Sequence, residues 1–247
     1  MSKILAFTNQ KGGVGKTTSA ANVGAGLARA GQRVLLVDLD PQGNLTKGLG
    51  LSEAEQTVYG ALLGEYKLKA YSLRENLALV AGSPALSGFE KLKGDELDRE
   101  FLLKELLEPI RERCDYILLD CPPALGLVTL NAYACAQALY IPLEAQLYAA
   151  DGLEKVLELV GRMKRRINPE LVVGGVFFTR HDKRKVLRRE TAEQLRVKHP
   201  GLVLDTVIRE SIALGEAPHL GQDIFSYAPQ SAGAADYQAL VAEILTR

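Results

Sequence analysis

Short apolar runs alternate with longer stretches of helical composition along the whole chain. Continuous apolar runs without polar alternation are typical of strands that are buried on both faces of a sheet. The runs expected to form strands are residues 3–8, 33–38, 77–80, 116–120, 138–142, 172–178 and 203–208. The stretches expected to form helices are residues 16–30, 96–113, 149–167, 184–198 and 232–245.

The stretch 149–167 has the clearest helical periodicity. The apolar side chains that recur there at helical spacing are Leu153, Val156, Leu157, Val160 and Met163. Strands that alternate with helices predict an α/β fold, a single doubly wound and mostly parallel sheet flanked by helices. No proline- or serine-rich linker interrupts the pattern, so we expect one domain over residues 1–247.

The composition is that of a globular protein in water. Hydrophobic residues make up 47% and charged residues 24% of the 247 residues. No apolar run approaches the roughly 18 residues that span a bilayer, and the N-terminus lacks the pattern of a signal peptide. Cys114, Cys121 and Cys135 have no metal-ligand spacing. We therefore expect reduced thiols in a cytoplasmic protein without a membrane anchor.

Charge is balanced overall but unevenly distributed. Residues 162–198 carry twelve Lys/Arg against four Asp/Glu, although the formal net charge of the chain is zero. Such asymmetry indicates either an anionic partner for this region or two solvated helix faces, and charge alone leaves both open.

The stretch NQKGGVGKTT, Asn9–Thr18, follows a predicted strand and opens a predicted helix. Its end, Gly15-Lys16-Thr17, matches a phosphate-binding loop, in which backbone N–H groups and the helix dipole attract phosphate. The residues expected to bind the nucleotide phosphates are Gly12, Gly13, Val14, Gly15, Lys16, Thr17 and Thr18. Lys16 is expected on the β- and γ-phosphates and the Thr17 hydroxyl on Mg²⁺. The alternative is a glycine-rich turn with an incidental lysine.

Acidic side chains end two of the predicted strands. Asp120 ends YILLD, and Asp38 and Asp40 follow RVLLV. A lone aspartate after a strand is often a turn or helix cap. Here the carboxyl ends of parallel strands bring three carboxylates towards one phosphate loop, which predicts a Mg²⁺ site.

Four stretches together resemble the ParA/MinD ATPases with a deviant Walker A motif, most closely the chromosomal ParA (Soj) partition ATPases. They are QKGGVGKTT, VDLDPQGN, LLDCPP and IRESIALGEAPHLGQDIFSYAPQSAGAADY. The resemblance covers nearly the whole chain. It implies an ATPase that binds ATP and Mg²⁺, forms a homodimer around ATP and is slow without its partner.

The resemblance also assigns roles to single residues. Lys11 is expected to cross the dimer interface to the phosphates of the partner subunit's ATP; otherwise it is an exposed loop lysine. Lys11, Lys16, Asp40 and Asp120 are the implied catalytic residues, with Asp40 positioning the attacking water. Thr17, Asp40 and Asp120 are the implied metal site, and Asp38 is expected behind these direct ligands.

Base recognition is implied for Phe178–Arg180 and Ile208–Glu210. The residues expected there are Arg180, Ile208, Arg209 and Glu210. This chain departs from the family's pattern in that region. Val207-Ile208-Arg209-Glu210 stands where the family has text close to I-P-R-N. Glu144-Ala145-Gln146 likewise exchanges the acid and amide of the usual Q-x-E.

The basic stretch is the expected contact with non-specific double-stranded DNA. Its implied DNA-binding residues are Lys183, Arg184, Lys185, Arg188, Arg189 and Arg209. The resemblance implies an ATP-dependent sandwich dimer on nucleoid DNA, released when a centromere-bound ParB-like protein stimulates hydrolysis. A MinD-like positioning ATPase is the main alternative, and an amidoligase with a second substrate pocket stays open. The sequence does not distinguish a chromosome from a plasmid or another cargo.

Overall fold

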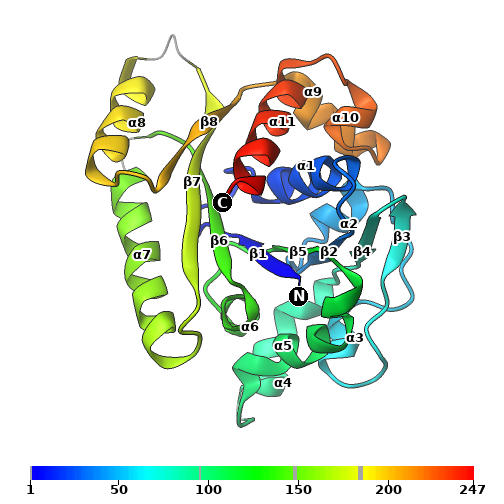
Figure 1. Cartoon of the computed structure of the whole chain (residues 1–247). Helices are drawn as coiled ribbons and strands as arrows, with labels where there is room; N and C mark the ends of the chain where they lie inside the picture. The colour runs from blue at the N-terminus through cyan, green and yellow to red at the C-terminus, as the bar shows by residue number, and fades with distance from the viewer. Residues whose placement is uncertain (1, 95, 147–148, 183–185) are drawn as a thin grey trace.

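The computed structural model describes residues 2–94, 96–146, 149–182 and 186–247. An eight-stranded sheet in the order β3-β4-β2-β5-β1-β6-β7-β8 runs through the molecule (Figure 1). Its strands are β1 Lys3–Phe7, β2 Val34–Asp38, β3 Tyr71–Arg74, β4 Leu77–Val80, β5 Tyr116–Asp120, β6 Ala138–Leu143, β7 Val172–His181 and β8 Val203–Arg209. β3 pairs antiparallel with β4, and the other neighbouring pairs are parallel. The expected α/β fold with a mostly parallel sheet is confirmed.

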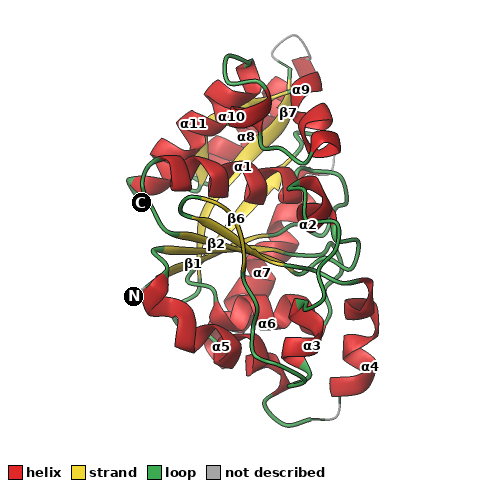
Figure 2. Ribbon diagram, turned by 90° about the vertical axis from the view of Figure 1, so that its right-hand side faces the viewer, coloured by secondary structure: helices red, strands yellow, loops and turns green. Residues whose placement is uncertain are grey.

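Helices cover both faces of the sheet. They are α1 Lys16–Arg29, α2 Asn44–Gly48, α3 Val58–Leu62, α4 Phe89–Lys93, α5 Leu102–Leu107, α6 Leu127–Cys135, α7 Ala149–Arg166, α8 Val186–Lys198, α9 Ile212–Glu216, α10 Ile224–Tyr227 and α11 Ala232–Leu245. Figure 2 shows α1, α10 and α11 on one side of the sheet and α5, α6 and α7 on the other. Each side has its own hydrophobic core, so the strands between them are apolar throughout. In the described part of the chain, no helix has the length and apolar character needed to cross a membrane.

The register of the central strands positions the functional site. All five residues of β2 and all five of β5 are buried. Asp38 at the end of β2 lies beside Asp120 at the end of β5, and Phe7 at the end of β1 lies beside Asp120 on the other side. The loops that follow these three strands therefore leave the sheet at one edge.

The structure differs from the prediction at one strand and one helix. The edge strand β3 was not predicted, because it has only a short polar alternation and pairs antiparallel through a bulge. The continuous helix expected at residues 96–113 is wrong. Within it, α5 is flanked by 3₁₀ segments at Arg99–Phe101 and Glu108–Arg113. Pro109 lacks an N–H and clashes with the preceding turn, so the α-helix ends at Leu107.

The apolar stripe of α7 faces the sheet with a small shift. Leu153, Val156, Val160 and Met163 are buried as predicted, and Leu159 joins them. Leu157 is only partly buried at the margin. No observation tests the single-domain expectation for residues 1–247, which stays a prediction.

Candidate functional site

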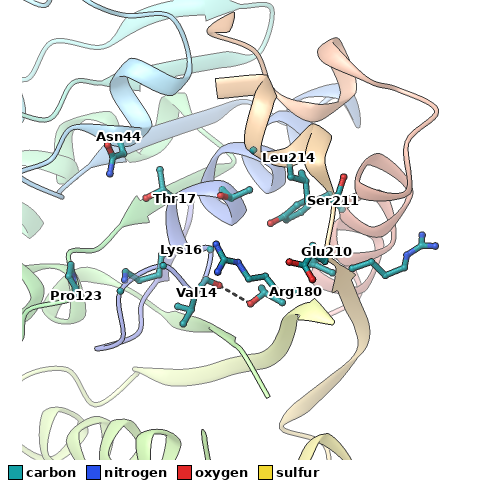
Figure 3. Close-up of a pocket in the computed structure, with 18 of the residues that line it drawn as sticks. Val14, Lys16, Thr17, Asn44, Pro123, Arg180, Glu210, Ser211 and Leu214 are labelled. Carbon is teal, nitrogen blue, oxygen red and sulfur yellow. Dashed lines mark hydrogen bonds between the residues drawn. The ribbon is translucent and has the colours of Figure 1, made fainter. Parts of the chain in front are cut away.

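The loop between β1 and α1 forms the floor of a cavity of about 610 Å³. Gly13 and Gly15 have left-handed backbone conformations, with φ of 73° and 90°. A side chain at either position would be strained there. Gly15 is also the N-cap of α1, so the first N–H groups of this helix face the cavity. Figure 3 shows Val14, Lys16 and Thr17 along this wall. The predicted phosphate-binding residues thus lie together in a geometry that suits an anion.

Side chains from neighbouring strands anchor the loop. The Thr179 hydroxyl at the end of β7 donates a hydrogen bond of 2.8 Å to the Val14 carbonyl, drawn as the dashed line in Figure 3. The Asn9 amide donates to the Pro142 carbonyl of β6 at 2.8 Å. These contacts join residues more than 130 positions apart, so the sequence pattern did not indicate them.

Lys16 is buried at the centre of the site. Its Nζ donates a hydrogen bond of 3.2 Å to the Lys11 carbonyl, which closes the loop over itself. Burial lowers the pKa of Lys16, whereas the negative charges of Asp120 and Asp40 raise it. A phosphate group in the cavity would supply the counter-charge that this buried ammonium lacks.

Asp120 is the most unusual carboxylate of the site. It is fully buried, and neither oxygen has a hydrogen bond of ordinary geometry among the residues that the structure describes, although the Thr17 hydroxyl lies close enough to oppose the shift in its pKa. Burial and the neighbouring charge of Asp38 raise its pKa well above the ordinary value, against the effects of Thr17 and Lys16. An unpaired buried carboxylate is costly, so this position calls for a cation or a proton.

Asp120, Thr17 and Asp40 are a donor set that fits Mg²⁺. Asp40 lines the cavity together with Thr17. Within the described ranges, no group of three or more His, Cys, Asp or Glu side chains could hold a metal alone. Mg²⁺ is usually held by one or two protein oxygens together with substrate phosphates and water, which is the arrangement that this site offers.

Asp38 and Asp40 have different surroundings although they are two residues apart. The Asp38 carboxylate accepts hydrogen bonds from the Thr46 hydroxyl at 2.6 Å and from the Thr46 N–H at 2.8 Å. Burial raises the pKa of Asp38, and these hydrogen bonds oppose the shift. Asp38 therefore fixes the start of α2, as a residue behind the direct ligands would. One oxygen of Asp40 accepts from the Gln42 N–H at 2.9 Å, and Asp40 lines the cavity, which Asp38 does not.

The Lys11 side chain leaves the phosphate loop towards the end of β6. Its ammonium donates a hydrogen bond to the Gln146 side chain and lies 4.0 Å from a carboxylate oxygen of Glu144. The Lys11 side chain is 52% exposed, whereas that of Glu144 is 8% exposed. In this chain alone, Lys11 therefore points away from the phosphate-binding N–H groups.

The far wall of the cavity contains the residues expected at the base. Arg180, Ile208, Arg209 and Glu210 all line it. Arg180 has a left-handed conformation, with φ of 48°, which is uncommon for a residue with a side chain. The Arg209 guanidinium makes an ion pair with Asp236 of α11 at 2.6 Å, so Asp236 orients it. Figure 3 shows Glu210 and Ser211 on this wall.

Several lining residues lie within the stretches that carry the resemblance but were not named individually as site residues. They are Asn44, Pro123, Ser211, Leu214, Gly215 and Tyr237, and Thr179 lies inside the range Phe178–Arg180 that was expected at the base. Tyr237 is buried, and its hydroxyl lies 3.0 Å from that of Ser19 on α1. Its position within the C-terminal stretch of the resemblance was the one signal available.

The basic region is only partly described. Lys183, Arg184 and Lys185 lie outside the described residues, as does the side chain of Arg188. Arg189 is exposed on α8. Two basic residues further along α8 have intrachain partners, since Arg196 lies over the Phe178 ring and Lys198 pairs with Glu154 at 2.6 Å. Arg189 in the first turn of α8 is thus exposed, whereas the basic residues described at the other end of the helix have intrachain partners.

The chain is similar to known proteins over most of its length. A protein-family model described as an AAA domain matches residues 2–173. The chain is 45% identical to the chromosome-partitioning ATPase Soj of Treponema pallidum, over 100% of this chain and 98% of that protein. It is 42% identical to the sporulation initiation inhibitor protein Soj of Bacillus subtilis, over 99% of this chain and 98% of that protein. A similar solved structure is cobyrinic acid a,c-diamide synthase from Mycobacterium smegmatis with bound ADP and magnesium. Its TM-score is 0.87 and its identity 31%, over 99% of this chain and 94% of that one.

Proposed function

The chain belongs to the Soj/ParA family of chromosome-partitioning ATPases, and on this premise we propose that it is an ATP-hydrolysing DNA-partition protein. The observation that carries the proposal is the convergence of a phosphate loop with Asp40 and the buried, unpaired carboxylate of Asp120. A glycine-rich turn alone would not require two acids at the carboxyl ends of two other strands.

The nucleotide lies with its phosphates on the N-terminus of α1. The backbone N–H groups of residues 12–18 surround the phosphates, and the Lys16 ammonium moves from the Lys11 carbonyl to the β- and γ-phosphates. The Thr17 hydroxyl and the carboxylates of Asp120 and Asp40 would hold Mg²⁺, and its charge would offset that of the phosphates. Arg180 and Ile208–Glu210 contact the base.

Hydrolysis needs a positioned water and a second cation. Asp40 lines the cavity and keeps one carboxylate oxygen for a water beside the γ-phosphate. Lys11 of the other subunit in a sandwich dimer supplies positive charge to the phosphoryl oxygens, as an arginine finger does in trans. ATP is then both the substrate and the link between the subunits.

The ATP-bound dimer binds double-stranded DNA without sequence preference, through the start of α8. The residues proposed to contact DNA are Lys183, Arg184, Lys185, Arg188, Arg189 and Arg209. A ParB-like protein on the centromere stimulates hydrolysis, and the resulting monomers leave the DNA. The protein thus acts in the cytoplasm on the nucleoid, as one domain, and its cargo is a chromosome or a plasmid.

The two lysines of the loop provide the test. Lys16→Ala should abolish nucleotide binding, because no other described ammonium is buried under the phosphates. Lys11→Ala should leave ADP binding unchanged, weaken the ATP-dependent dimer and slow hydrolysis by roughly 10³-fold or more. Nucleotide titration and sedimentation with ATP and with ADP separate these effects. Normal dimerisation and hydrolysis by Lys11→Ala would rule out the trans role.

A further inference from the structure

Lys11 is held at three points within its own chain. Its N–H donates to the Asn9 side chain at 2.9 Å, and its carbonyl accepts from Lys16 Nζ at 3.2 Å. Its ammonium is bound by the Gln146 side chain and lies beside the Glu144 carboxylate. The two side chains that receive the ammonium come from the segment that follows β6, more than 130 residues away.

The acid of this pair is placed to attract a cation. Glu144 is 8% exposed, whereas the Lys11 side chain that reaches it is 52% exposed. A nearly buried carboxylate binds a neighbouring ammonium more strongly than a solvated one does, because less water screens the charge. The contact therefore favours a Lys11 orientation that points away from the nucleotide cavity.

We infer that Glu144 and Gln146 form an intrachain binding site for the Lys11 ammonium. Lys11 must leave this site before its ammonium can bind the nucleotide phosphates of a partner subunit. The inference rests on the proposed trans role of Lys11. One lysine cannot occupy both sites, so each subunit loses its contact with Glu144 and Gln146 when it donates Lys11 across the dimer. The pair thus positions Lys11 and weakens the dimer.

ATP bound to the same subunit weakens a second contact of Lys11, the hydrogen bond at its carbonyl. In the structure, the Lys16 ammonium donates a hydrogen bond to the Lys11 carbonyl. Phosphates bound beside Lys16 would compete with that carbonyl for the three N–H donors of the ammonium, so this anchor of the Lys11 segment would be weakened. The intrachain site thereby makes release of Lys11 depend on nucleotide in its own subunit, before any partner is met.

The first arm of the test measures the contact in the nucleotide-free protein. Acetylation of Lys11 by limiting acetic anhydride is followed by mass spectrometry in wild type, Glu144→Gln and Gln146→Ala. The exposed Lys155 on α7 serves as the internal reference. The expected result is a Lys11 rate about two- to fivefold higher in both variants, which is the range for one ion pair or hydrogen bond at a half-exposed side chain. Glu75→Gln removes an exposed carboxylate away from both lysines in the sequence and should leave the Lys11 rate, relative to Lys155, unchanged.

The second arm measures the dimer by sedimentation at saturating ATP and Mg²⁺. Each variant should tighten the dimer by about two- to fivefold per subunit, hence about 4- to 25-fold for two symmetric subunits. An unchanged Lys11 rate, or a dimer that is equal to or weaker than wild type, overturns the inference. A wild-type protein that stays monomeric with ATP instead overturns the proposed function, while the labelling arm still reports the intrachain contact.

Discussion

Two aspartates at the end of β2 illustrate how surroundings separate the roles of like residues. Asp40→Ala should slow ATP hydrolysis by roughly 10²- to 10⁴-fold, because the carboxylate that faces the cavity no longer orients water. The phosphate loop remains intact, so the ATP-bound dimer should persist and still bind DNA. Size exclusion with ATP, together with phosphate release, measures both effects.

Asp38→Asn is the matched control for that experiment. One oxygen of the buried Asp38 carboxylate accepts two hydrogen bonds from Thr46, and the other accepts from the Asp40 N–H at 3.2 Å, so the NH2 group of an amide would face at least one of these donors. We expect a loss of about 1–3 kcal/mol in the free energy of unfolding. That corresponds to roughly 2–4 °C in Tm per kcal/mol for a chain of this size. A stable Asp38→Asn protein with no hydrolysis, or a monomeric Asp40→Ala protein at saturating ATP, would contradict these assignments.

Single residues could be predicted from the sequence where binding of phosphate requires certain residue types at a fixed spacing. Lys16 and Thr17 were predicted from the phosphate-loop motif, and Asp40 and Asp120 from their places after two parallel strands; their roles stay predictions. Contacts between residues far apart in sequence were not predictable from the pattern. The pairing of Arg209 with Asp236 and that of Lys11 with Gln146 are examples.

Elements were predicted best where hydrophobic burial alone defines them. Strands such as β2 and β5 are buried at every residue, so their apolar runs were sufficient. α6 was missed because it is buried nearly all round and has no polar face to give a period. α5 is shorter than its helical composition suggested because of Pro109. Local breaks and full burial are thus the two features that periodicity does not report.

Close packing of α1 against α11 is an element-scale feature that gives a stability prediction. A Cβ atom at Gly26 would lie 2.7 Å from a Val241 methyl carbon and 3.3 Å from the Phe225 ring. Gly26→Val should therefore lower the free energy of unfolding by about 1–3 kcal/mol through overpacking. Thermal unfolding measures this loss.

Gly152 on α7 offers a matched position for the same substitution. A Cβ there would have no heavy atom within 4 Å. Gly152→Val should change stability by no more than about 0.5 kcal/mol, as surface substitutions do. Equal losses at the two positions would mean that valine itself, and not the α1–α11 contact, causes the effect.

At the scale of the whole molecule, the two basic segments lie at opposite ends of the strands. We call the side where the parallel strands begin the amino edge and the side where they end the carboxyl edge. α8 begins after the carboxyl end of β7, beside the nucleotide cavity that Arg180 lines. α7 ends in Lys164, Arg165 and Arg166 just before β7 begins, so this cluster lies at the amino edge. A dimer that closes over two nucleotides would bring together only the patches at the carboxyl edge. DNA binding through α8 should therefore depend on ATP, since a monomer presents half of the contacts.

Arg189→Ala tests this arrangement, with Arg165→Ala as the matched variant at the other edge. If Arg189 contacts a phosphate, its loss should weaken binding to every DNA sequence alike. It should also reduce the slope of log affinity against log salt by about one, or up to about two in a symmetric dimer. The measurement is DNA affinity across a salt series with ATP and with ADP. Equal affinity in the two nucleotides would exclude the switch. A reduced slope in Arg165→Ala and an unchanged slope in Arg189→Ala would move the DNA surface to the amino edge, where dimerisation over ATP does not join the patches.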